Sequence, residues 1–220
     1  MKLTYSKDAP NYGVVELIRK PLQAFFDEVT ILLPELPNEL NIWLDNSFLV
    51  SDTGEGGAAY SPDTITVSFD KDFQDKSSQL KNLRGTVFHE AYHLVQGHTI
   101  VDGKAAYRSM LDSAIYEGCA TVFERDYAGV VPLWGEYKQH SIQELMSWQD
   151  AMSAIPTEDY ESEDSNLWNM WAYYDKEDGQ RWKAYKTGSW LADKAIKTSN
   201  IDILKLRSDS AENIINLIKI

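Results

Sequence analysis

Two histidines four residues apart, in the sequence His89-Glu90-Ala91-Tyr92-His93, constrain this chain more than any other feature. On a helix, residues four apart lie on the same face about one turn from each other, so both imidazoles can bind a single ion. Glu90 is adjacent and can reach a water molecule on that ion. Because half of the four histidines of the chain fall in this motif, we expect a metal site here rather than a chance match.

The flanking residues predict the helix that carries the motif, from Ser78 to Gln96, with Gly97 as its C-terminal stop. At about 100° per residue, apolar side chains form one stripe, and the two histidines lie on the opposite side. The stripe that we expect to face the core consists of Leu80, Leu83, Val87, Ala91 and Leu94. The histidines therefore point away from this stripe, which fits a metal site in a cleft.

A catalytic zinc ion needs a third protein ligand and leaves its fourth position to water. His98 follows the motif, but its spacing differs by one residue from the HExxHxxGxxH pattern. His140 is remote in sequence and adjoins a polar run. Glu117, on a second predicted helix, is the favoured ligand, and the small residues Gly118 and Ala120 allow that helix to approach the first one closely.

The composition excludes several other classes of protein. The chain has 220 residues, with 21 basic and 34 acidic side chains, which gives a net charge of −13. Such a surface repels phosphate backbones, so we expect no nucleic-acid partner. We also expect no membrane partner, because no uncharged stretch approaches the roughly 18–20 residues of a membrane-spanning helix. Cys119 is the only cysteine, which excludes an internal disulfide and suits a cytoplasmic protein, or a secreted one whose leader was removed.

The apolar pattern predicts an α+β fold, in which a small N-terminal mixed sheet precedes a helical region within a single domain over residues 1–220. A strand is expected at 64–69 because this segment alternates β-branched, apolar and polar residues, and 41–44 is a short strand candidate. Between them, Gly54–Gly57 is expected to form a flexible loop.

Further helices follow from apolar residues at helical spacing. The first contains Pro21, so we expect a kink or two shorter helices there. The last begins at a capping box formed by Asp209 and Glu212. Nine acidic residues between 150 and 178 predict an exposed loop in the middle of that segment. The helices are expected at 14–29, 109–127, 180–197 and 210–219.

These motifs resemble those of the gluzincin zinc peptidases, in which HExxH precedes a Glu-Gly-x-Ala segment on a second helix. More narrowly, the chain is similar to a little-characterised bacterial family of predicted zinc-dependent proteases. The shared segments are FHEAYHLVQG at 88–97, LDSAIYEGCATVFE at 111–124 and an aromatic-x-x-Gly helix at 185–188. The resemblance covers about residues 40–195, with a zinc core at about 60–195.

This resemblance implies a zincin-like fold and one zinc ion per chain, bound by His89, His93 and Glu117. It also implies that Glu90 is the general base of peptide-bond hydrolysis, so the partner is a peptide or protein substrate. Glu124, two turns after Glu117, is a candidate hydrogen-bond acceptor for a ligand imidazole.

The same resemblance leaves two further roles to assign. The oxyanion of the reaction needs a hydrogen-bond donor besides the metal, and Tyr185 is the first candidate and His140 the second. Strand 64–69 precedes the metal-motif helix, as in gluzincins, where an edge strand beside the site can pair with an extended peptide.

Other functions remain as alternatives. The main one is a zinc-bound pseudoenzyme that binds peptides or proteins without cleaving them, although a purely structural site has no use for Glu90. A di-iron bundle would need a second Glu-x-x-His motif on another helix, which the sequence lacks. A carbohydrate-binding module would use the Trp- and Tyr-rich segment at 168–190, although such residues more often form cores and interfaces.

Overall fold

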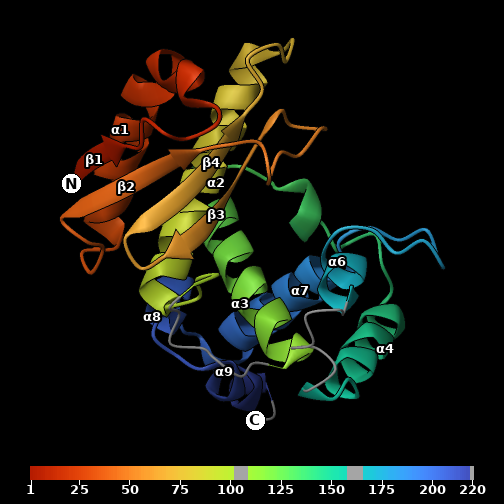
Figure 1. Cartoon of the computed structure of the whole chain (residues 1–220). Coiled ribbons are helices and arrows are strands. Elements are labelled where there is room, and N and C mark those ends of the chain that lie inside the picture. Colours follow the sequence, from red (N-terminus) through yellow and green to blue (C-terminus); the bar gives the residue numbers. More distant parts are fainter. Residues whose placement is uncertain (102–108, 158–165, 219–220) are drawn as a thin grey trace. The chain divides into compact units, whose positions relative to one another are not determined.

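The computed structural model describes residues 1–101, 109–157 and 166–218 (Figure 1). The chain divides into two compact units. The first, called the sheet unit, comprises residues 1–104 and 124–130, and the second, called the helical unit, comprises residues 105–123 and 131–220. The single domain expected from the sequence stays a prediction.

The sheet unit contains a four-stranded mixed sheet in the order β1-β2-β4-β3. Neighbouring strands are parallel in the pairs β1–β2 and β2–β4 and antiparallel in the pair β3–β4 (Figure 1). The strands are β1 (Lys2–Tyr5), β2 (Glu39–Leu44), β3 (Glu55–Ser61) and β4 (Thr64–Phe69). The expected α+β fold with a small N-terminal mixed sheet is therefore confirmed, as are the two strands expected at 41–44 and 64–69.

β4 is a central strand, so the expectation that segment 64–69 lies at the edge of the sheet is wrong. It lies between β2 and β3, and its residues from Ile65 to Phe69 are all buried. A short turn joins β3 to β4, with Ser61 paired to Thr64, so β3 lies on the outer side of β4. The edge strand on this side of the sheet is therefore β3.

The flexible loop expected at Gly54–Gly57 is also wrong, because Glu55, Gly56 and Gly57 form the first part of β3. A Cβ atom at Gly56 would overlap the backbone carbonyl of Phe48. Glycine is thus required by a close approach of two backbone segments, not by flexibility. Composition alone does not distinguish these two uses of glycine.

Helix α1 (Val15–Leu32) runs unbroken through Pro21, so the expected alternative of two shorter helices is wrong. A proline inside a helix costs about 3 kcal/mol, whereas each buried aliphatic or aromatic side chain contributes about 1.5–3 kcal/mol. The apolar face of α1 outweighs the proline. Its buried residues are Val15, Ile18, Leu22, Phe26 and Val29.

Helix α2 spans Lys76–Gln96 and contains the two-histidine motif, close to the expected range. The side chain of Asp75 caps its N-terminus by accepting a 3.0 Å hydrogen bond from the amide of Ser78. At the other end Gly97 adopts a left-handed φ of 71°, as the expected stop requires. The amide of His98 then donates to the carbonyl of His93 at 2.9 Å, which closes the helix.

α2 is buried on every side between Gly85 and His93, because it packs against α1, β3 and the π-helical turn η2 (Glu124–Ala128). The histidine face is therefore part of the interior, although the sequence placed it outside the core stripe. Within that stripe the buried residues are Leu83, Val87 and Ala91, and the half-buried ones are Leu80 and Leu94.

The helical unit is built on the contact between α3 (Met110–Phe123) and α7 (Lys183–Ser199). A Cβ atom at Gly118 would overlap the backbone of Gly188, and one at Gly188 would overlap the carbonyl of Ala114. The small residue at Gly118 therefore admits α7, whereas the sequence suggested that it admits the metal-motif helix. The helices expected at 109–127 and 180–197 are confirmed.

Shorter helices complete the helical unit, and four of them, η3, α4, α6 and α8, were not expected from the sequence. The helix expected at 210–219 is confirmed, but its cap is Ser210, whose hydroxyl accepts a 3.2 Å hydrogen bond from Asn213, and not Asp209. The exposed loop expected within 150–178 falls largely on residues 158–165, outside the described residues. These elements are η3 (Leu133–Gly135), α4 (Ile142–Ser153), α6 (Leu167–Ala172), α8 (Ile203–Leu206) and α9 (Ala211–Ile218).

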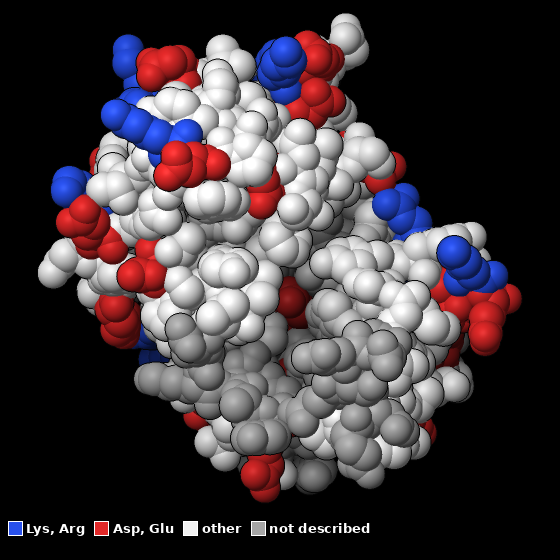
Figure 2. Space-filling model, viewed as in Figure 1, with Lys and Arg blue, Asp and Glu red and all other residues white. Residues whose placement is uncertain are grey.

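The described part of the chain contains no helix that is both long and apolar enough to span a lipid bilayer. Figure 2 shows acidic and basic side chains interspersed on one face of the molecule.

The packing of α2 predicts unequal effects of two leucine truncations. Leu83 is 0% exposed, so Leu83→Ala should lower the free energy of unfolding by about 2–5 kcal/mol. Leu94→Ala should cost less, because Leu94 is half-buried. Urea denaturation of both variants measures this difference, and a negligible loss at Leu83 would contradict the described orientation of α2.

Candidate metal centre

The two histidines of α2 direct their Nε2 atoms at each other, 3.0 Å apart. Their rings meet edge to face with centroids 4.7 Å apart, and His89 and His93 are only 5% and 3% exposed. Two nitrogen ligands of a tetrahedral zinc ion, each at 2.0–2.1 Å, lie roughly 3.3 Å apart. The pair therefore has nearly the separation that a shared metal ion imposes.

The hydrogen bonds of the two Nδ1 atoms assign the tautomer of each ring. Nδ1 of His89 lies 3.2 Å from Oε2 of Glu124, and Nδ1 of His93 lies 3.2 Å from Oε1 of Gln96. Carboxylate and amide oxygens accept hydrogen bonds, so each Nδ1 carries a proton in these contacts. When both rings are neutral with the proton on Nδ1, the two Nε2 atoms present lone pairs to each other, an arrangement that a cation between them would stabilise.

The carboxylate of Glu124 lies close to α2 because that helix has a glycine, Gly85, at the point of contact. Glu124 is 0% exposed and belongs to η2, within the sheet unit. A Cβ atom at Gly85 would overlap its carboxylate. Gly85 thus lets the carboxylate reach the ring of His89, one turn further along α2, and sequence analysis did not single out this glycine.

Glu90 is anchored by a backbone group of the edge strand. It is 7% exposed, and its Oε2 accepts a 2.8 Å hydrogen bond from the backbone N–H of Ala59 in β3. Sequence analysis identified Glu90 but could not identify Ala59, because a backbone donor places no constraint on residue type.

A third carboxyl group of the sheet unit, Glu55, was not expected from the sequence. It is 0% exposed and accepts a hydrogen bond from the hydroxyl of Thr86. Burial raises the pKa of Glu55 to about 7, against the lowering effect of hydrogen bonds from Thr86 and Thr53, and the nearby charge of Glu124 raises it further. Glu55 therefore gains or loses its proton near neutral pH.

Two other predicted site residues lie in the helical unit. Glu117 is on α3, 9% exposed, next to the glycine at which α3 crosses α7. Tyr185 is on α7, one turn before Gly188, and it is half-buried with its ring centroid 6.3 Å from that of Trp168. Glu117 and Tyr185 therefore lie on two helices that pack directly against each other.

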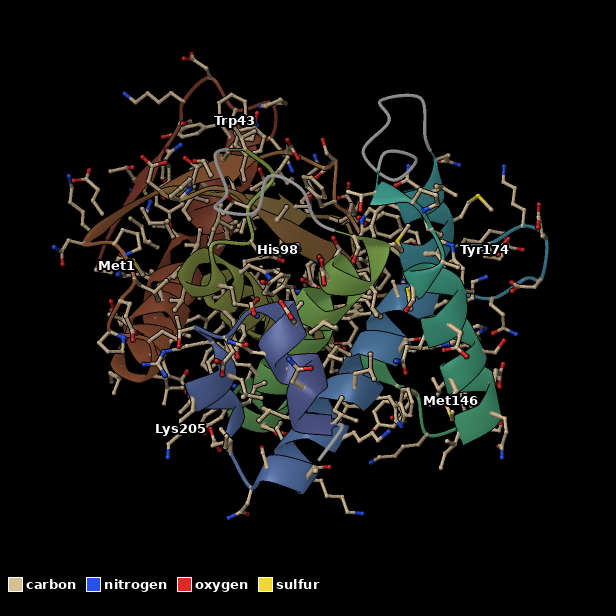
Figure 3. The ribbon with its side chains drawn as sticks, turned by 90° about the horizontal axis from the view of Figure 1, so that it is seen from below. Met1, Trp43, His98, Met146, Tyr174 and Lys205 are labelled. Carbon is tan, nitrogen blue, oxygen red and sulfur yellow. The ribbon has the colours of Figure 1, made fainter. Side chains whose placement is uncertain are left out.

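The two remaining histidines have other surroundings. His98 follows the C-terminal end of α2 (Figure 3), and its ring centroid lies 4.6 Å from that of His93. His140, in the helical unit, contacts Glu144 through Nδ1 at 3.2 Å and Lys186 through Nε2 at 3.1 Å. Both ring nitrogens of His140 are thus engaged within its own unit.

The chemistry of the donors suits zinc. His89, His93 and Glu117 each offer one ligand atom to a metal ion. Imidazole nitrogen and carboxylate oxygen are both common zinc ligands, and three protein donors leave a position for water. The roles of these residues stay predictions.

Comparison with known proteins identifies the family. Residues 23–216 match the model of a family described as "Predicted Zn-dependent protease (DUF2268)". The chain belongs to this family. No curated protein and no solved structure matches it. The zinc dependence and proteolysis predicted for the DUF2268 family agree with the two buried, metal-ready imidazoles of α2.

The buried carboxyl of Glu55 predicts a pH effect on stability. Its pKa in the folded protein is about 7, above the ordinary value of 4.5. Its contribution to stability is therefore fully present below about pH 4.5 and is lost as the pH rises through about 7. At roughly 1.4 kcal/mol per pKa unit, this loss amounts to a few kcal/mol at most.

Glu55→Gln cannot ionise, so this variant should lose less stability than the wild type between pH 5 and pH 8. Urea denaturation of both metal-free proteins at several pH values measures the difference. Thr53→Val, which removes a hydrogen bond to Glu55 but keeps its carboxyl group, is a control that should retain the pH-dependent loss. Parallel pH profiles for the wild type and Glu55→Gln would contradict the raised pKa.

Proposed function

We propose that this protein is a zinc-dependent peptidase in which His89, His93 and Glu117 bind one zinc ion and Glu90 activates a water molecule. The observation that carries the proposal is the 3.0 Å approach of two buried Nε2 atoms, since the Nδ1 atom of each ring faces an oxygen acceptor on the far side. Membership of a family of predicted Zn-dependent proteases supports the same metal and the same reaction class.

The spacing along one helical segment supports Glu117 as the third ligand. Glu124 accepts a hydrogen bond from Nδ1 of His89, and α3 leads without interruption into the turn that carries Glu124. Glu117 precedes it by two turns on nearly the same face, which corresponds to about 10.5 Å along the axis. A chain of carboxylate, imidazole, zinc and carboxylate also spans roughly 10 Å. One segment can therefore supply a carboxylate on each side of His89.

The proposed reaction is the hydrolysis of a peptide bond. Zinc, when bound, lowers the pKa of its water to about 7 and polarises the substrate carbonyl. Glu90 accepts the proton of the water and returns it to the nitrogen of the departing amine. The Glu124 carboxylate keeps the proton of His89 on Nδ1, so that Nε2 stays available as a ligand.

Tyr185 is the proposed donor to the oxyanion of the tetrahedral intermediate. It lies on α7, and that helix crosses α3 next to Glu117, which supports a place for its hydroxyl near the third ligand. His140 is less suited to this role because Glu144 and Lys186 occupy both of its ring nitrogens.

The main alternative is a zinc-bound pseudoenzyme that binds peptides or proteins without cleaving them. The anchored carboxylate of Glu90 favours a peptidase, because a site that only binds metal and peptide gains nothing from a buried base next to its ligand. The resemblance to gluzincins supports the same choice.

Metal content tests the proposed ligands. The purified wild type should contain one zinc ion per chain, whereas His89→Ala and Glu117→Ala should be strongly depleted, as atomic emission measures. His140→Ala is the matched control, since this histidine lies outside the proposed ligand set, and it should retain the ion. Full zinc occupancy in Glu117→Ala would exclude Glu117 and direct attention to His98.

Glu90→Gln tests the chemistry separately from metal binding. This variant should fold and retain zinc, because Glu90 is not a proposed ligand. The loss of general-base catalysis should lower turnover by about 10²–10⁴-fold, as cleavage of a fluorogenic peptide library measures. Wild-type rates in the zinc-loaded variant would contradict the mechanism, and a zinc-loaded wild type that cleaves no peptide would favour the pseudoenzyme.

A further inference from the structure

The outward edge of β3 is relevant to substrate binding, and the inference drawn from it rests on the proposed peptidase function. The pairing of β3 with β4 is regular from Glu55 to Ala59. The carbonyl of Gly54 accepts a 2.9 Å hydrogen bond from Asp70, at the end of β4. Backbone groups alternate in an antiparallel pair, so Glu55, Gly57 and Ala59 direct their N–H and C=O groups away from β4.

Two of these three outward positions are occupied. The carbonyl of Glu55 accepts a 3.0 Å hydrogen bond from Val50, and the carbonyl of Ala59 accepts a 3.0 Å hydrogen bond from Ile100. Within the described residues, no group pairs with Gly57 on its outward side. At this edge, the N–H and C=O groups of Gly57 are therefore available, whereas the carbonyls of Glu55 and Ala59 on either side already accept hydrogen bonds.

The N–H of Ala59 is committed to the side chain of Glu90. Its 2.8 Å hydrogen bond to Oε2 is buried, and a hydrogen bond to an ionised acceptor is about twice as strong as a neutral one. An amide that points outward from an edge strand would otherwise be available to an incoming peptide. Here it fixes the direction of a carboxylate that belongs to α2.

Gly57 provides the space in which the side chain of Glu90 lies. A Cβ atom at this position would lie 3.2 Å from Cγ of Glu90 and 2.8 Å from Cγ2 of Thr86. Both distances are shorter than ordinary carbon–carbon contacts of about 3.5–4.0 Å. Any side chain at position 57 would therefore press on the stem of Glu90.

We propose that β3 positions the general base: the Ala59 amide fixes the carboxylate of Glu90, and Gly57 leaves room for its stem while keeping its own N–H and C=O open to the main chain of an extended peptide substrate. Ala59 and Gly57 are thus positioning residues. The histidines are held by α2 and η2, whereas the base is aimed by the strand on which the substrate lies.

Ala59→Pro tests the amide contact, because proline has no N–H. Proline is tolerated on an edge strand where the N–H faces away from the ladder. The variant should retain its zinc, its fold and a KM within about twofold of the wild type, since Gly57 is unchanged. Its kcat should fall by about 10–10²-fold, the effect of a misplaced reacting group. The substrate is the best-cleaved member of the fluorogenic peptide library.

Ala58→Pro is the matched control, because the N–H of Ala58 faces β4 and its loss breaks the ladder. This variant should lose thermal stability, whereas Ala59→Pro should not. A wild-type kcat in zinc-loaded Ala59→Pro would overturn the role of the amide while leaving the peptidase function intact.

Gly57→Ala tests the space next to Glu90 and does not depend on the folding of a proline variant. It should lower kcat while zinc is retained. Combining it with Thr86→Ser removes the methyl group at 2.8 Å and leaves the contacts with Cγ of Glu90 at 3.2 Å and with the carbonyl oxygen of Thr66 at 3.1 Å. The low kcat should persist in the double variant, and its recovery would assign the effect to Thr86 and overturn the role of Gly57.

An amide resonance tests the contact without any activity. In protein labelled with ¹⁵N-alanine, the Ala59 amide proton should move upfield in Glu90→Gln, because a neutral acceptor replaces a charged one. The Ala58 amide, which faces β4, should stay in place. An unchanged Ala59 resonance would overturn the contact itself, even if the protein proves to cleave no peptide.

Discussion

The close approach of two buried imidazoles is the constraint around which the polar groups in the interior of the sheet unit are arranged. His89 and His93 face each other at 3.0 Å, and both are shielded from water that could otherwise screen them. Glu124 and Gln96 hold the protons on the far sides of the rings. A cation between the rings would turn the repulsion between their Nε2 lone pairs into attraction, which is the physical basis of the proposed metal site.

The carboxyl groups around this pair are buried, so each needs a partner that stabilises its charge or else favours its neutral form. Glu124 is stabilised by the proton of His89, and Glu90 by the amide of Ala59. Burial raises the pKa of Glu55 to about 7, although the hydrogen bond from the Thr86 hydroxyl acts in the opposite direction. Burial favours the neutral form of a carboxyl group, which is the cause of the raised pKa of Glu55.

The elements that the sequence predicted well are those with local signals. α2 has an N-terminal acidic cap and a glycine stop, and β4 has a clear alternation of residue types. Predictions failed where a distant contact decided the outcome. A loop was predicted at Gly56 because the sequence does not show that this residue lies against the backbone of Phe48. A break was predicted at Pro21 because the local sequence does not show how much apolar surface α1 buries against other elements.

For the site, the sequence by itself determined the paired imidazoles and the adjacent Glu90, because spacing on one helix fixes which side chains share a face. The sequence also offered Glu124 as a candidate acceptor for a ligand imidazole. Only the tertiary structure decided that this acceptor reaches His89, that the histidine face is buried, and that the Ala59 amide anchors Glu90. These contacts join α2 to η2 and β3, and two of them depend on glycines that leave space for a carboxylate. The roles of a glycine and of a backbone amide depend on which groups pack against them, and the sequence does not specify those neighbours.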